Sequence, residues 1–276
     1  MAFITYRPSH AYLTTITIAF LLSVAAFSAN ALDKNQAYSA LGNIYQAQIH
    51  SYYSVNGFYN FSANLGDQQQ LATINESVTK IDELMASLEG ELSEAPTTET
   101  AKLAISAWKK YLNVLNQNIN EVKKTGYPDL RLAGDMATTN ISFNEALKEL
   151  YSVITRDETN KPDEFTTASR RSAITMALMM TKYSARSTST VSQVYTGGDS
   201  EITIDSLAKE FNETLAKLLE LTKDNESAQD WLNSADTKWN FIKPSYLNYN
   251  ENRVNFIVNL YSKKIISDVE SASAAF

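Results

Sequence analysis

Three arginines stand in a stretch that otherwise consists mainly of alanine, methionine, leucine and threonine. They are Arg170, Arg171 and Arg186, half of the six arginines that follow residue 31. An arginine side chain is always charged, and its planar fork of donors grips planar anions such as carboxylates. The pattern therefore indicates an anion-binding position between helices. The alternative is that these side chains extend into solvent from the start of a helix or pair with acids on neighbouring helices.

Four tyrosines spaced seven residues apart form a second pattern. They are Tyr38, Tyr45, Tyr52 and Tyr59. Because seven residues are close to two turns of an α-helix, the four rings should fall along one face. One interpretation is a core seam whose hydroxyls reach the edge of a helix bundle. The other is the wall of a polar, aromatic pocket, in which Tyr45 and Tyr52 would contact a ligand.

The remaining residue types argue against catalysis and against bound metals or cofactors. The chain has no cysteine, which excludes disulfides, thiolate catalysis and covalent c-type haem. His50 is the single histidine after residue 31, and no paired Glu-x-x-His motif of a di-iron bundle is present. A Ser-His-Asp set would have to use His50, and there is no glycine-rich phosphate loop. We therefore expect no enzymatic activity, no metal site and no cofactor.

The charge of the chain limits its partners. The formal net charge is −7, and no dense block of lysine and arginine interrupts the acidic composition. Nucleic acids and anionic membrane surfaces repel such a chain. We expect neither as a partner.

The first 31 residues predict a secretory signal peptide. Arg7 precedes an apolar run over 11–27, and Ala29-Asn30-Ala31 supplies the small-x-small pattern of a cleavage site. The run contains several hydroxyl residues and is about as short as a membrane span can be, which favours a cleaved signal over a retained anchor. No later stretch approaches the length of a transmembrane helix. An exported chain without cysteine suits a bacterial periplasm.

Apolar residues recur three or four positions apart along most of the chain, a spacing typical of helices that pack side by side. The clearest runs cover 71–92 and 101–122, the tyrosine helix should cover about 33–64, and a further helix about 129–156. Eight helices are expected, and Pro244 should kink the seventh or end it early. The residues expected to separate helices are Gly66, Gly90, Pro96, Gly126, Pro128, Pro162, Gly197 and Gly198.

The two halves of the chain repeat a pattern. Gly66 precedes Trp108 by 42 residues, and Gly198 precedes Trp239 by 41. Four helices joined by short loops pack naturally as an up-down bundle. We therefore predict an all-α fold of two tandem up-down four-helix bundles, over 32–156 and 163–276, that follow a cleaved signal peptide over 1–31. Trp108 and Trp239 should be core residues.

The second half also resembles a known family. Residues 168–176 read Ala-Ser-Arg-Arg-Ser-Ala-Ile-Thr-Met, Phe211 and Leu215 fall in the next helix, Trp239 in the third, and a last apolar helix covers 254–269. This order is similar to the N-terminal sensor domain of type IV pilus methyl-accepting chemotaxis transducers (PilJ-type), which is related to the sensor of nitrate/nitrite histidine kinases (NarX-like). That domain opens with a helix of the form Gly-Arg-Gln-Arg-Met-Leu-Ser-Gln-Arg-Met.

The resemblance covers about 165–272, with a fainter echo over 35–155. Arg170 matches a motif arginine, whereas Ser172 and Ala177 stand where the later arginines would be. That family is usually held between transmembrane helices and feeds a cytoplasmic signalling domain. The resemblance therefore implies a free-standing periplasmic version that binds a ligand or a membrane receptor in solution.

These observations lead to two functional hypotheses. The first is a soluble periplasmic sensor-type module that binds a small ligand, an anion among the candidates, or a receptor partner, and acts without catalysis. The second is a structural or adaptor protein of the cell envelope. A ligand module should have a buried polar pocket near Arg170 or the tyrosines, whereas an adaptor should have an exposed apolar or aromatic patch.

Overall fold

The computed structural model describes residues 32–93, 97–187, 202–248 and 254–276. All regular secondary structure in this part of the chain is helical, which confirms the predicted all-α class. The predicted signal peptide, Pro96, Gly197 and Gly198 lie outside the described residues. The α-helices are α2 (Lys34–Ala63), α3 (Gln68–Glu91), α4 (Thr98–Thr125), α5 (Leu130–Ile154), α6 (Glu164–Ser187), α7 (Ile204–Leu221), α8 (Glu226–Leu247) and α9 (Asn255–Ala275), and one 3-10 turn, η1 (Glu158–Asn160), lies between α5 and α6.

Helix starts follow the capping residues in the sequence. Helix α6 begins at Glu164, directly after Asp163, whose carboxylate accepts a hydrogen bond of 2.8 Å from the Thr166 amide. Asp67, Asp129, Thr203 and Asn225 accept equivalent bonds at the starts of α3, α5, α7 and α8. Each of these side chains satisfies an amide that the first turn of a helix leaves without a partner.

Two helix ends differ from the sequence expectation. Gly90 lies inside the last turn of α3 and not after it. Helix α8 continues through Pro244 and ends at Leu247. Because Pro244 stands in the last turn, its missing N–H removes a single internal hydrogen bond, and the helix completes that turn. None of the helices within the described ranges is both long enough and apolar enough to cross a membrane.

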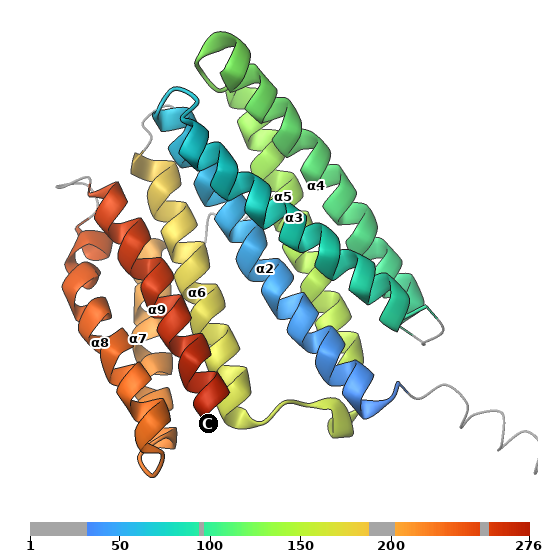
Figure 1. The fold of residues 1–276 in the computed structure, drawn as a ribbon, viewed down its shortest axis with the longest axis vertical. Coiled ribbons are helices and arrows are strands. Elements are labelled where there is room, and N and C mark those ends of the chain that lie inside the picture. The colour runs from blue at the N-terminus through green and yellow to red at the C-terminus, as the bar shows by residue number, and fades with distance from the viewer. Residues whose placement is uncertain (1–31, 94–96, 188–201, 249–253) are drawn as a thin grey trace, which may run out of the picture.

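The helices form two groups, each with its own hydrophobic core. Helices α2 to α5 enclose one core, and α6 to α9 enclose the other. Helices α2 and α6 lie side by side in the middle of the molecule, with α9 on the far side of α6 (Figure 1). Tyr45, Ile49 and Tyr52 of α2 belong to the second core, and Ala185 of α6 belongs to the first. The contact between α2 and α6 therefore joins the two groups.

The two central helices are buried on more than one face. Most side chains of α2 and α6 are buried, and many of these are small or polar. A helix that is covered all round cannot keep a polar face for solvent, so its polar side chains need partners within the protein. Asn56 of α2 shows the consequence: its amide donates to Ser184 Oγ of α6 at 2.7 Å and to Asn259 Oδ1 of α9 at 2.8 Å.

Further polar side chains of α2, α6 and α9 join these contacts. Asn255 of α9 donates to Asn60 Oδ1 of α2 at 2.6 Å, and Asn259 donates to Asn255 Oδ1 at 3.0 Å. Ser184 of α6 donates to Asn255 Oδ1 at 2.9 Å. This asparagine cluster ties α2, α6 and α9 together near one end of the central pair. Because an unsatisfied buried amide is costly, the cluster fixes the register of the three helices.

The two tryptophans occupy matching places in the two groups. Trp108 of α4 is 2% exposed and donates its ring N–H to Asp82 Oδ1 of α3 at 2.7 Å. Trp239 of α8 is 0% exposed and donates to Asn212 Oδ1 of α7 at 3.4 Å. In each group, the third helix thus contributes a buried indole that bonds to the second helix.

Replacing either indole with a methyl group should leave a large cavity. We expect Trp108→Ala and Trp239→Ala each to lower the free energy of unfolding by about 3–5 kcal/mol, measured by urea denaturation. Trp231→Ala is the matched control, because Trp231 lies on α8 but is 43% exposed, and it should cost less than about 0.5 kcal/mol. Equal losses in all three variants would contradict the core assignment.

Candidate functional site

Two cavities lie on opposite sides of the contact between α2 and α6, and both are lined by Tyr45 and Arg170. The first has a volume of about 470 Å³ and is lined by residues of α2, α6 and α9. We call it the α9-side cavity; Gly42, Tyr45, Gln46, Ser169, Arg170 and Glu270 contribute to its walls. The second, of about 510 Å³, we call the α5-side cavity; Tyr45, Tyr52, Lys148, Arg170, Arg171 and Glu210 contribute to its walls. Both volumes fall in the range of small-molecule sites, roughly 300–1,000 Å³.

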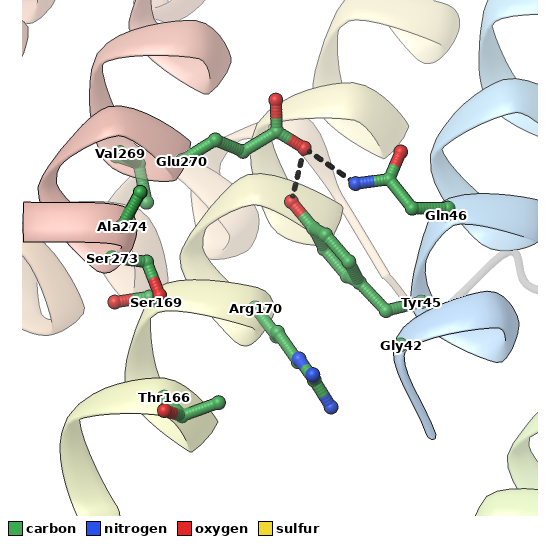
Figure 2. Close-up of a pocket in the computed structure, with 10 residues that line it drawn as sticks. All are labelled: Gly42, Tyr45, Gln46, Thr166, Ser169, Arg170, Val269, Glu270, Ser273 and Ala274. Atoms are coloured by element: carbon green, nitrogen blue, oxygen red, sulfur yellow. Dashed lines mark hydrogen bonds between the residues drawn. The ribbon is translucent and has the colours of Figure 1, made fainter. Parts of the chain in front are cut away.

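Tyr45 is the central side chain of this site. Its hydroxyl donates to Glu270 Oε1 at 2.9 Å, and the amide of Gln46 donates to the same oxygen at 3.0 Å (Figure 2). The face of its ring lies 5.7 Å from the Arg170 guanidinium carbon, a cation–π distance. Tyr45 thus contacts α6 through its ring and α9 through its hydroxyl.

The environment of Tyr45 keeps its phenol protonated. Burial raises the pKa of Tyr45 far above its ordinary value, and the negative charge and hydrogen bond of Glu270 raise it further. The positive charge of Arg170 acts in the opposite direction but does not compensate. The phenol is therefore a fixed hydrogen-bond donor to Glu270 at neutral pH.

Arg170 brings a cation to the site without an acidic partner. No carboxylate lies within the 4.0 Å of an ion pair from Arg170 in the described parts of the chain. Its Nη1 atom is buried and has no hydrogen-bond partner there. Gly42 of α2 lies close to the guanidinium, and a Cβ atom at that position would be in ordinary van der Waals contact with Arg170 Nη2 at 3.9 Å. A buried charged donor without a hydrogen-bond partner destabilises the folded protein, and an acceptor on a bound ligand would remove that cost.

The neighbouring arginine is engaged within the protein. Arg171 Nε donates to Glu210 Oε1 of α7 at 2.8 Å, and Thr175 Oγ1 donates to the same oxygen at 3.2 Å. Lys148 of α5 lines the same α5-side cavity. The cavity therefore carries three cationic side chains and one carboxylate, and its charge is suited to an anion.

Four of the five ligand-binding residues expected from the sequence meet at this site. Tyr45, Tyr52, Arg170 and Arg171 all line the α5-side cavity. Arg186 does not: it is exposed in the last turn of α6, 16 residues beyond Arg170, which is about 24 Å along a helix. Arg186 therefore does not line either of the two cavities.

The tyrosines do not form one continuous seam. Tyr38 is exposed, and its hydroxyl donates to the Lys161 carbonyl at 3.2 Å. Tyr59 is fully buried in the first core, whereas Tyr45 and Tyr52 belong to the second. A seven-residue spacing drifts by about 20° per repeat around a straight helix, so the four rings reach different surroundings.

Sequence reasoning missed Glu270, Gln46 and Ser169. Glu270 is one of many acids in the sequence, and only the packing of α9 beside α2 gives it a role. No local motif could have marked these three residues.

The histidine and the acids offer no metal centre. No group of three or more His, Asp or Glu side chains in the described ranges could hold a metal ion. His50 lies one turn after Gln46, with its ring 5.8 Å from that of Tyr53. Burial and the nearby charge of Lys80 lower the pKa of His50, so the ring is neutral at neutral pH.

Comparison of the chain with known protein families, with curated proteins and with solved structures finds no match. The chemistry of the cavities must therefore be judged from their own residues.

The buried phenols should make the fold sensitive to alkali. The pKa values of Tyr45, Tyr53, Tyr59, Tyr111 and Tyr246 are all raised above the ordinary value of 10.0, chiefly by burial. Above pH 10.0 the unfolded chain loses these protons while the folded chain keeps them, so their contribution to stability is complete below that pH and falls as the pH rises.

Tyr45→Phe should flatten the alkaline loss of stability. Between about pH 10 and pH 11 we expect the variant to lose about 1 kcal/mol less of its free energy of unfolding than the parent, measured by urea denaturation at a series of pH values. Phe58→Leu is the control, because it disturbs the core without removing a phenol and should keep the parent slope. An unchanged slope for Tyr45→Phe would show that its phenol ionises in the folded state.

Proposed function

We propose that this protein is a non-catalytic, sensor-type module that binds a small ligand with an anionic group at the contact between α2 and α6. The observation that carries this proposal is the Arg170 guanidinium, which borders two cavities, lies against the Tyr45 ring and has a buried Nη1 atom without a hydrogen-bond partner among the described residues. An arginine side chain that borders a cavity and has an unpaired guanidinium nitrogen is suited to a bidentate hydrogen bond with a carboxylate or another planar anion.

The site also offers a route from binding to response. Its walls come from both helix groups, α2 and α5 from one and α6, α7 and α9 from the other. A ligand that contacts both groups stabilises one relative arrangement of them over others. A binding partner that recognises this arrangement would then respond to the bound ligand without any chemical reaction.

The wider setting is part of the same proposal. The chain comprises two tandem up-down four-helix bundles, over 32–156 and 163–276, behind a cleaved signal peptide over 1–31, and works in the periplasm. The separate cores and the matching positions of Trp108 and Trp239 support the tandem arrangement. The resemblance to PilJ-type sensor domains, which includes Arg170, supports the sensor role.

A second candidate function is that of an envelope adaptor that acts through protein contacts. It is favoured by exposed apolar side chains on α8, on α9 and just before α9, namely Phe241, Leu247, Val254, Phe256 and Leu260. The rings of Phe241 and Tyr261 lie 4.9 Å apart at this surface. Exposed patches of this kind mark binding surfaces for other proteins. A receptor that contacts the proposed sensor could use the same surface.

A thermal-shift screen with an Arg170 variant tests the ligand proposal. Purified protein is titrated with nitrate, sulfate, acetate, succinate and the standard L-amino acids. A ligand at one hundred times its dissociation constant adds about 2.7 kcal/mol, which raises the melting temperature of a chain of this size by several degrees. We expect at least one saturable shift, and Arg170→Gln should abolish it while the variant stays folded.

Arg131→Gln is the matched control, because this substitution removes the same charge from an exposed position on α5. It should keep the parent response. Shifts of equal size in the parent, Arg170→Gln and Arg131→Gln would contradict a site at Arg170. The absence of any shift would favour the adaptor function.

A further inference from the structure

The α9-side cavity carries charges of both signs that are not paired with each other. Glu270 and Arg170 both line it, yet neither takes part in any ion pair within the described ranges. Glu270 instead receives two neutral hydrogen bonds on Oε1, from Tyr45 and from Gln46. These bonds fix the carboxylate in place without neutralising it.

Tyr45 contacts both of these charged side chains. Its hydroxyl holds Glu270 at one end, and its ring face covers Arg170, so the carboxylate and the guanidinium lie at different parts of the same phenol (Figure 2). Direct pairing of an arginine with a glutamate at one cavity would ordinarily be favourable. Here the two side chains contact different parts of Tyr45 and do not pair with each other, so both charged groups can contact a bound ligand.

A buried hydroxyl completes the polar lining. Ser169 of α6 is 2% exposed, lines the α9-side cavity, and its Oγ has no hydrogen-bond partner among the described residues. Figure 2 shows Ser169 beside Ser273 of α9, on the α6 and α9 side of the cavity. A buried hydroxyl without a hydrogen-bond partner is unfavourable, so a ligand atom that bonds to Ser169 Oγ would remove that cost.

We propose, building on the proposed function, that the ligand of the α9-side cavity is a free α-amino acid bound as its zwitterion. Its carboxylate accepts hydrogen bonds from the Arg170 guanidinium, and its ammonium group donates to the Glu270 carboxylate. The hydroxyl of Ser169 bonds to the carboxylate or the ammonium group beside it.

Other classes of ligand match the cavity less well. A simple anion would pair with Arg170 but face the charge of Glu270, and a simple amine would pair with Glu270 but face Arg170. The unfavourable contact with the like charge offsets part of the gain from the favourable one. A zwitterion avoids both penalties, because it places an opposite charge against each side chain and adds no net charge to the site.

Isothermal titration with matched triplets of compounds tests this ligand class. Each triplet contains an amino acid, the carboxylic acid that lacks its amine, and the amine that lacks its carboxylate. The triplets are L-alanine, propionate and ethylamine; L-leucine, isocaproate and isoamylamine; and L-phenylalanine, hydrocinnamate and phenethylamine. We expect at least one amino acid to bind at least about tenfold more tightly than both of its partners, which is about 1.4 kcal/mol.

Two charge-removing variants assign the contacts. Glu270→Gln keeps an acceptor for the Tyr45 hydroxyl but removes the charge, and it should weaken amino-acid binding at least about tenfold. Arg170→Gln should do the same. Glu213→Gln and Arg131→Gln change the same charges at exposed positions and should bind like the parent. Urea denaturation of all four variants shows whether each remains folded.

The possible failures separate the two proposals. If propionate, isocaproate or hydrocinnamate binds as tightly as its amino acid, and binding depends on Arg170 but not on Glu270, the zwitterion inference is overturned and the anion site stands. If binding depends on neither residue, or no compound of any triplet binds, the zwitterion inference is overturned. In the latter case, the anion screen with Arg170→Gln decides the proposed function independently.

Discussion

The structure depends on one packing constraint: α2 and α6 form the contact that joins the two helix groups, and each is covered on more than one face. Helices in that position cannot separate apolar and polar faces in the usual way. Their buried residues instead include many small and polar side chains, and several of these, such as Asn56 and Ser184, bond to neighbouring helices. The asparagine cluster closes the contact near one end of the pair. Nearer the start of α2, at Tyr45, the two cavities border the same contact between α2 and α6.

The charges at this opening follow from the same constraint. Tyr45 is long enough to span from α2 to α9, where its hydroxyl bonds to Glu270, and its ring lies against Arg170 of α6. One aromatic side chain therefore positions a cation and an anion at a single cavity. Because Arg170 and Glu270 belong to the second helix group and Tyr45 belongs to the first, we expect ligand binding at this cavity to be coupled to the relative position of the two helix groups.

Local patterns in the sequence predicted the helices well, because capping residues and breakers such as Asp163, Pro162 and Gly126 act within one turn. The arginine and tyrosine patterns also pointed to Arg170 and Tyr45. These patterns do not show how far apart residues lie along a helix. Arg186 follows Arg170 by 16 residues, which is about 24 Å along α6. The drift of a seven-residue spacing around a helix separates Tyr38 and Tyr59 from the site. Glu270 was beyond prediction, because its role arises from a contact with Tyr45 across 225 positions of the chain.

Amide hydrogen exchange, read by mass spectrometry with and without a mixture of the standard L-amino acids and small carboxylates, tests the central claim most directly. Ligand binding at the α2–α6 contact should slow exchange in peptides that contain Gly42 to Tyr52, Thr166 to Thr175 and the end of α9, because those segments line the cavities. The rest of the chain should change little. Unchanged exchange in these segments, or slowing confined to the apolar surface around Phe241 and Phe256, would contradict the account.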